Sequence, residues 1–180
     1  MENLDDIINI EKHPINNDKY IKDCNKQIQK NSILILNNFL NYNCLKELTN
    51  EALKLEEKAF YCSQKHTILL NKSNKSEDPN DPTNIEVTSD KGCIPHDLIN
   101  DNSKLNLLYK SSSFMNFLKG VLNLNNLYPY KDTLSSINYN YYQQSQQLGW
   151  HFDNASFAIT LMIQSSDSGG EFEYVSKGRD

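Results

Sequence analysis

The sequence has little of what several classes of protein require. Arginine occurs once, at Arg179, among 18 basic residues, and the net charge is −5, so no clustered positive charge marks a nucleic-acid-binding surface. The four cysteines include no C-x-x-C pair, which excludes zinc-finger spacing, and a chain of this size needs no disulfide framework. No apolar run approaches the roughly 20 residues of a membrane span. The acidic start, Met1–Asp6, is unlike a signal peptide. We expect free, mostly buried thiols, no nucleic-acid or membrane partner, and a cytoplasmic location.

Enough apolar sequence is present for one core. The 180 residues are 38% hydrophobic and 23% charged, the composition of a single globular domain. Apolar residues at helical spacing predict a serine-capped helix at 111–122, with the cap among Ser111–Ser113. The same spacing predicts further helices at 20–28, 42–60 and 102–109. The compact apolar run Ser32–Leu36 predicts a buried strand, and the polar stretch Asn71–Asp90, with Pro79 and Pro82, predicts a long loop.

The pattern becomes strand-like at Thr133. Residues 157–164 alternate with both faces largely apolar, as in a strand that lies between two layers. Gly169 and Gly170 predict a tight hairpin turn with positive φ, followed by a short second strand at 171–174. We therefore expect one domain, in which residues 1–132 form a helical region with the first strand or strands and the 71–90 loop, and residues 133–180 form a sheet region.

Two residues of this sheet region carry metal-binding chemistry. His151 and Asp153 lie two positions apart, so on an extended backbone their side chains point to the same face. An imidazole nitrogen and a carboxylate oxygen supply two of the three ligands in the facial triad that binds non-haem Fe(II). The bare pattern also occurs as a surface ion pair, so the residues around it decide between the two interpretations.

The stretch from Trp150 through Phe157–Gln164 to Gly169–Phe172 resembles the core of the Fe(II)/2-oxoglutarate-dependent oxygenases. Within them it is most similar to the branch of carrier-independent amino-acid halogenases and their hydroxylase relatives, and the resemblance is sharp over 138–175. It implies an α+β fold with a double-stranded β-helix core (jelly-roll, cupin-like) that N-terminal helices buttress. Only the first part of that core is present before residue 180, so the implied fold is incomplete at the C-terminus.

The resemblance also implies roles for individual residues. His151 and Asp153 would bind Fe(II), with 2-oxoglutarate and O₂ as co-substrates. The strand Asn138–Tyr142 resembles the one that holds 2-oxoglutarate in the family, and Asn140 with Tyr142 could donate hydrogen bonds to its carboxylates.

Alternatives remain for these residues. The other strand register would present Tyr139 and Tyr141, and the aromatic residues could equally pack in a core. Trp150 and Asn154 are candidates for the wall of the substrate pocket, or a packing residue and a turn residue respectively.

The carboxylate at Asp153 separates two activities. In the related halogenases a small residue stands at this position and leaves room for chloride at the iron. Asp153 therefore favours a hydroxylase or desaturase over a halogenase. Because this branch acts on free amino acids, the expected substrate is a small molecule of that kind.

Two elements of the family pattern have no counterpart. The family places a third ligand, a histidine, and the arginine for 2-oxoglutarate well after the H-x-D pair, whereas His13, His66 and His96 precede it and Arg179 follows too closely. The sequence thus predicts the N-terminal part of a longer oxygenase that is inactive alone. The alternatives are a non-catalytic cupin-like binding remnant, in which the pair is vestigial, and the recruitment of His96 as the third ligand.

Overall fold

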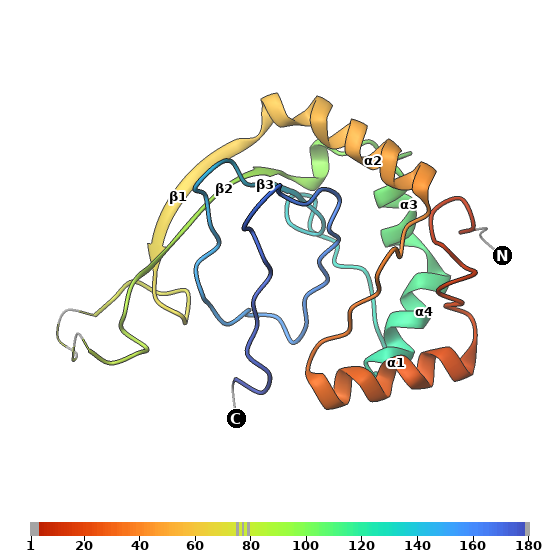
Figure 1. The fold of residues 1–180 in the computed structure, drawn as a ribbon, viewed down its shortest axis with the longest axis horizontal. Helices are drawn as coiled ribbons and strands as arrows, with labels where there is room; N and C mark the ends of the chain where they lie inside the picture. Colours follow the sequence, from red (N-terminus) through yellow and green to blue (C-terminus); the bar gives the residue numbers. More distant parts are fainter. Residues whose placement is uncertain (1–3, 75, 77, 79, 179–180) are drawn as a thin grey trace. The chain divides into compact units, whose positions relative to one another are not determined.

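The computed structural model describes residues 4–74, 76, 78 and 80–178 (Figure 1). These divide into two compact units. Unit 1 comprises Met1–Ala52, Pro95–Ile137 and Glu171–Asp180, and unit 2 comprises Leu53–Ile94 and Asn138–Gly170. The elements follow in the order α1 Asp18–Asn31, α2 Tyr42–Leu55, the 3-10 turn Glu56–Lys58, β1 Phe60–His66, β2 Val87–Ile94, the 3-10 turn His96–Leu98, α3 Lys104–Lys110, α4 Ser112–Val121 and β3 Tyr139–Tyr141.

Helices α1, α3 and α4 build much of unit 1. The Asn17 side chain accepts a hydrogen bond from the Tyr20 N–H at 3.0 Å and so caps the start of α1. Helix α1 packs on α4 at Gly120, where a Cβ would lie 2.5 Å from the Ile21 side chain. The predicted helix at 111–122 is confirmed as α4, and the predicted cap is Ser111, whose hydroxyl accepts from the Phe114 N–H.

The buried strand predicted at Ser32–Leu36 is wrong. Ser32 adopts a left-handed conformation, φ 62°, that closes α1, and the residues after it have no regular structure and no partner strand among the residues described. The Ile35 side chain is 64% exposed. An apolar run of this length needs a neighbouring strand to become a strand, and the only bridge nearby in the described chain joins Ile8 to Leu40.

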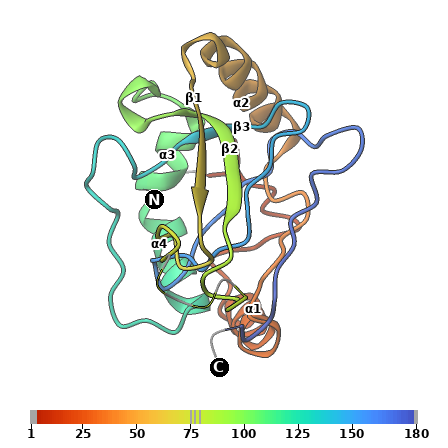
Figure 2. The same cartoon turned by 90° about the vertical axis from the view of Figure 1, so that its left-hand side faces the viewer.

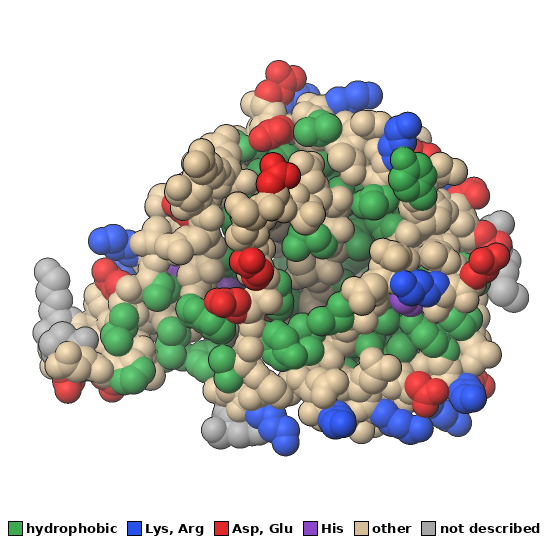
Figure 3. All heavy atoms as spheres, in the orientation of Figure 1, with side chains coloured by type: hydrophobic (Ala, Val, Ile, Leu, Met, Phe, Trp, Pro, Cys, Tyr) green, Lys and Arg blue, Asp and Glu red, His purple; other side chains and the backbone are tan. Residues whose placement is uncertain are grey.

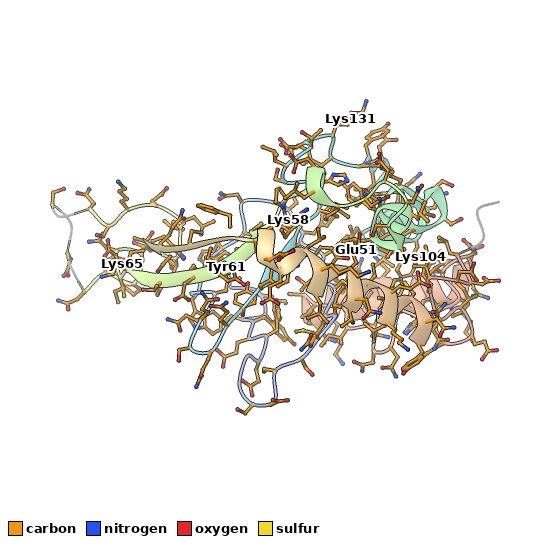
Figure 4. The ribbon with its side chains drawn as sticks, turned by 90° about the horizontal axis from the view of Figure 1, so that it is seen from above. Glu51, Lys58, Tyr61, Lys65, Lys104 and Lys131 are labelled. Carbon is orange, nitrogen blue, oxygen red and sulfur yellow. The ribbon has the colours of Figure 1, made fainter. Side chains whose placement is uncertain are left out.

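Unit 2 contains a three-stranded antiparallel sheet in the order β1-β2-β3 (Figure 2). Strand β2 is central and pairs with all of β1, from Phe60 opposite Cys93 to His66 opposite Val87. Gly92 lies under the Tyr61 ring, because a Cβ there would come within 2.7 Å of it. Tyr61 and Lys65, four residues apart, project from β1 as Figure 4 shows.

The loop predicted at Asn71–Asp90 extends too far toward the C-terminus. Strand β2 begins at Val87, so residues 87–90 are part of the sheet, and the connection from β1 covers only 67–86. The strand could not be recognised in the sequence, because its first half contains the polar residues Thr88, Ser89 and Asp90 and shows no apolar alternation. Pro79, which supported the loop, lies outside the described residues.

The strands predicted at 157–164 and 171–174 are also wrong, because the structure gives both stretches an irregular backbone. Gly169 and Gly170 have the expected positive φ of 70°, but no strands flank them. Ile159 and Met162 are more than half exposed, and Figure 3 shows hydrophobic side chains at the surface. A sandwich strand requires strands on both sides and a covering layer, and the described residues supply neither here. The double-stranded β-helix stays a prediction.

Two further expectations concern the whole chain. The four cysteines are free, as predicted, but Cys24 and Cys44 alone are buried, whereas Cys62 and Cys93 are partly exposed. Among the described residues, no helix combines the length and apolar character that crossing a membrane requires. The division of the chain at residues 132 and 133 is a prediction that the structure leaves open.

Candidate metal site at the His-x-Asp pair

The segment 147–153, which carries the pair, is held against the β1–β2 hairpin by hydrogen bonds of its backbone. At one end, the Asp90 N–H donates to the Gln147 carbonyl at 2.8 Å, and the Gln147 N–H donates to Asp90 Oδ1 at 2.6 Å. At the other end, the Phe152 N–H donates to the Ile68 carbonyl at 2.8 Å. The segment therefore has a fixed place beside the β1–β2 hairpin, although it contains no regular strand.

Gly149 is the closest point between this segment and the sheet. Its N–H donates to Ser89 Oγ at 3.0 Å. A Cβ at this position would lie 2.7 Å from the Thr88 carbonyl oxygen and 2.8 Å from Val87 Cγ2. Only glycine allows this approach, because a carbonyl oxygen within a strand cannot rotate away from a side chain.

His151 and Asp153 face each other as the spacing predicts. The His151 Nδ1–H donates to the Gly149 carbonyl at 2.8 Å, and Nε2 lies 3.1 Å from Asp153 Oδ1. A carbonyl oxygen only accepts, so Nδ1 carries a hydrogen, and the Nε2 position that faces the carboxylate holds either a second proton, in the charged ring, or a lone pair that a metal ion can take. Two lone pairs at this distance repel unless a positive charge, a proton or a metal ion, lies with them.

The donor pair fits a metal ion. Bonds of about 2.1 Å at right angles place adjacent ligand atoms about 3.0 Å apart, close to the observed separation. The His151 side chain is 19% exposed and that of Asp153 is 53% exposed, so the pair is anchored on one side and accessible on the other. Within the described part of the chain, no group of three His, Cys, Asp or Glu residues could hold a metal ion. The structure thus brings together the two residues predicted to be ligands, without a third such group in the described part of the chain.

His66, at the end of β1, is a neighbour of the pair that the sequence analysis missed. Its ring is buried and meets the His151 ring edge-on, with centroids 6.1 Å apart and planes at 88°. Its Nδ1–H donates to the Thr67 carbonyl at 2.8 Å, and its Nε2 lies 2.6 Å from Ser89 Oγ. Since both ring nitrogens are occupied, His66 supports the site rather than supplying a ligand.

His96 does not present a ligand atom either. Its Nδ1 lies 2.5 Å from Ser136 Oγ, and its Nε2 lies 2.6 Å from Asn106 Oδ1. Recruiting His96 as the third ligand would break at least one of these bonds and leave a buried partner unsatisfied. This hydrogen bonding argues against that alternative.

The residues predicted to bind 2-oxoglutarate lie at the edge of the sheet. Tyr139 of β3 is buried, whereas Asn140 is exposed on the other face of the strand. This difference fits the register that places Asn140 and Tyr142 together, although Tyr142 lies one residue beyond β3. Burial, with a smaller contribution from the nearby Cys93 thiol, raises the pKa of the Tyr142 phenol, so the phenol remains a hydrogen-bond donor at neutral pH.

The two pocket candidates flank the pair without enclosing it. Trp150 is about half exposed, and Asn154 is exposed beside Asp153. Their assignment to a substrate pocket stays a prediction.

An imidazole and a carboxylate on one anchored segment beside a small antiparallel sheet define the class: an α+β protein with a candidate metal site. Comparison with protein families then gives the relationship, because the model of one family, halogenase D, matches residues 16–180. The chain belongs to the halogenase D family. No curated protein and no solved structure matches the chain.

Proposed function

We propose that the protein is an Fe(II)- and 2-oxoglutarate-dependent dioxygenase that hydroxylates a small substrate such as a free amino acid. The observation that carries the proposal is the 3.1 Å approach of His151 Nε2 to Asp153 Oδ1 in a chain of the halogenase D family. Bound Fe(II) would supply the activation of O₂ for oxidation of an unactivated C–H bond. The protein would bind and orient the reactants.

Asp153 favours hydroxylation over halogenation. The resemblance of the sequence to the amino-acid halogenases implies that chloride-using enzymes have a small residue at this position. Here a carboxylate stands beside the ring nitrogen, and it both fills the space and repels an anion.

The remaining roles follow from position. Asn140 and Tyr142 would donate hydrogen bonds to the carboxylates of 2-oxoglutarate through a side-chain amide and a phenol. Trp150 and Asn154 adjoin the two ligands in sequence and would contact the substrate. Asn154 in particular would offer an amide to a polar group of an amino acid.

The test measures anaerobic Fe(II) binding in the presence of 2-oxoglutarate, followed by succinate release in air. We expect Asp153→Ala to weaken Fe(II) binding by more than the ~10–100-fold that loss of an outer hydrogen-bond partner costs, and to abolish any succinate release that the wild type shows. Asp167→Ala, which removes an exposed carboxylate elsewhere in unit 2, is the matched control and should behave as the wild type. Equal binding by wild type and Asp153→Ala would refute the proposal. A chlorinated product from the wild type would instead assign a halogenase.

A second candidate is a non-catalytic binding module in which His151 and Asp153 form an ordinary ion pair. It is favoured by one observation, that the described chain offers two neighbouring ligands but no group of three. This candidate predicts no metal-dependent binding of 2-oxoglutarate by the wild type. The same titration therefore separates the two.

A further inference from the structure

We propose that Ser89 of β2 is a positioning residue that, together with the buried His66, fixes the orientation and the tautomer of His151. The significance for metal binding rests on the proposed function, whereas the hydrogen-bond relay itself can be tested without metal. Ser89 and His66 are diagonal neighbours on one face of the hairpin, because Val87 pairs with His66 and Ser89 lies two residues further along β2.

The direction of the first hydrogen bonds follows from their partners. The Thr67 carbonyl can only accept, so the hydrogen of the neutral His66 ring is on Nδ1 and its Nε2 is an acceptor. The Ser89 hydroxyl therefore donates to His66 Nε2, at 2.6 Å. This leaves the lone pairs of Ser89 Oγ for the Gly149 N–H, which donates at 3.0 Å. The Ser89 hydroxyl thus donates to the His66 ring and accepts from the Gly149 N–H, and the buried His66 ring determines this direction.

Gly149 transmits this arrangement to the metal ligand. Its N–H is fixed by Ser89, and the same residue presents its carbonyl to His151 Nδ1–H at 2.8 Å. The absence of a side chain lets Gly149 lie directly on Thr88. The His66 ring also meets the His151 ring edge-on, so His151 is held both through its Nδ1–H and against its ring.

The consequence concerns the ligand atom. With the hydrogen on Nδ1, the lone pair of His151 Nε2 faces Asp153, where a metal ion would bind. In the other tautomer an N–H would occupy that position and block it. Outer hydrogen bonds of this kind fix the tautomer and ring orientation of metal-binding histidines. Ser89 would thus fix the tautomer and orientation of His151 already in the metal-free protein.

The first measurement is the ¹⁵N spectrum of the imidazoles in the metal-free protein, which reports which ring nitrogens carry a hydrogen. We expect Nδ1 of His151 to carry its hydrogen in all molecules of the wild type and in only part of the molecules of Ser89→Ala. Ser89→Thr keeps the hydroxyl and should restore the wild-type spectrum. Ser63→Ala makes the same change at an exposed position of β1 and should have no effect. If Ser89→Ala does not fold, Ser89→Cys, of similar size with a weak donor, takes its place.

The second measurement is titration with Co(II), which reports on the same ligands through its visible spectrum. We expect Ser89→Ala to lower the Co(II) affinity ~10–100-fold and Ser63→Ala to leave it unchanged. An unchanged His151 tautomer in Ser89→Ala overturns the proposal whatever the metal does. A changed tautomer with unchanged Co(II) affinity overturns the positioning role. If the wild type binds no Co(II) but its tautomer depends on Ser89, the relay stands and the proposed metal function fails.

Discussion

Gly149→Ala tests whether the position of the His-x-Asp segment depends on close contact with β2. The new Cβ would lie 2.7 Å from the Thr88 carbonyl oxygen and 2.8 Å from Val87 Cγ2. Thr88 is paired with Lys65 across the hairpin, so its backbone is held in the sheet. The segment must therefore move away from β2, and the hydrogen bond from Gly149 to Ser89 lengthens or breaks.

The expected cost follows from two opposing effects. Overpacking at a fixed backbone costs ~1–3 kcal/mol, whereas alanine restricts the unfolded chain and returns ~0.5 kcal/mol. The weakened hydrogen bond to Ser89 adds up to about 1 kcal/mol. We expect the free energy of unfolding to fall by about 0.5–3.5 kcal/mol. With an m-value of ~2 kcal/mol/M, the urea midpoint would fall by about 0.3–1.8 M.

The assay is urea unfolding followed by circular dichroism and by fluorescence of Trp150, the single tryptophan, which directly follows Gly149. Gly169→Ala is the matched control. Its Cβ would meet nothing within 4 Å, but its φ of 70° strains any residue with a side chain by ~1–2 kcal/mol. Both variants should lose stability, and only Gly149→Ala should change the native Trp150 spectrum and weaken Co(II) binding. An unaltered midpoint and unaltered Co(II) affinity for Gly149→Ala would refute the close-contact argument.

Three predictions concern unit 1. Ser111→Ala removes the cap that accepts from the Phe114 N–H and should lower the free energy of unfolding by ~1 kcal/mol, measured by thermal or urea unfolding. His96→Phe leaves the buried Asn106 Oδ1 without its partner at 2.6 Å and should cost ~1–3 kcal/mol in the same assay. Burial raises the pKa of the Cys44 thiol to about 11, so at pH 8 its thiolate fraction is ~100-fold below that of an ordinary cysteine and it should react slowest with a thiol reagent. Because the folded pKa is the higher one, this thiol stabilises the fold below pH 9, and that stability is lost as the pH rises toward 11.

The helices could be predicted from the sequence because their signals are local. Apolar residues at helical spacing identified α1, α2, α3 and α4, and a serine at the start of α4 identified its cap. The helix predicted at 42–60 was too long, because α2 ends at Leu55 and Phe60 already begins β1. Each signal lies within one or two turns of the residues it governs. The chain beyond does not have to be known.

The sheet could not be predicted in the same way. Strand β1 reads Phe-Tyr-Cys-Ser-Gln-Lys-His, without apolar alternation, and its partner β2 begins about 20 residues later with mostly polar positions. The pairing is therefore determined by non-local hydrogen bonds that no short window contains. The opposite error occurred at 157–164, where the alternation is regular but no neighbouring strand is present in the described residues.

The same distinction between local and non-local signals applies to the candidate site. The two-residue spacing of His151 and Asp153 was enough to predict that they face each other, and the 3.1 Å approach confirms it. Ser89 and His66 lie more than 60 residues before the pair, so their contribution became visible only when the hairpin brought them to Gly149. The one signal in the sequence was a histidine at the end of an otherwise polar run.

The family assignment and Asp153 bear on different parts of the function. The match to halogenase D spans residues 16–180 and shows the family, whereas the proposed preference for hydroxylation rests on the carboxylate at one position. There the carboxylate oxygen lies 3.1 Å from His151 Nε2, at the separation of two ligands of one ion. An anion could enter only by displacing that oxygen against its negative charge. On the proposed function, membership of a halogenase family is compatible with hydroxylation, and residue 153 is where the two activities would diverge.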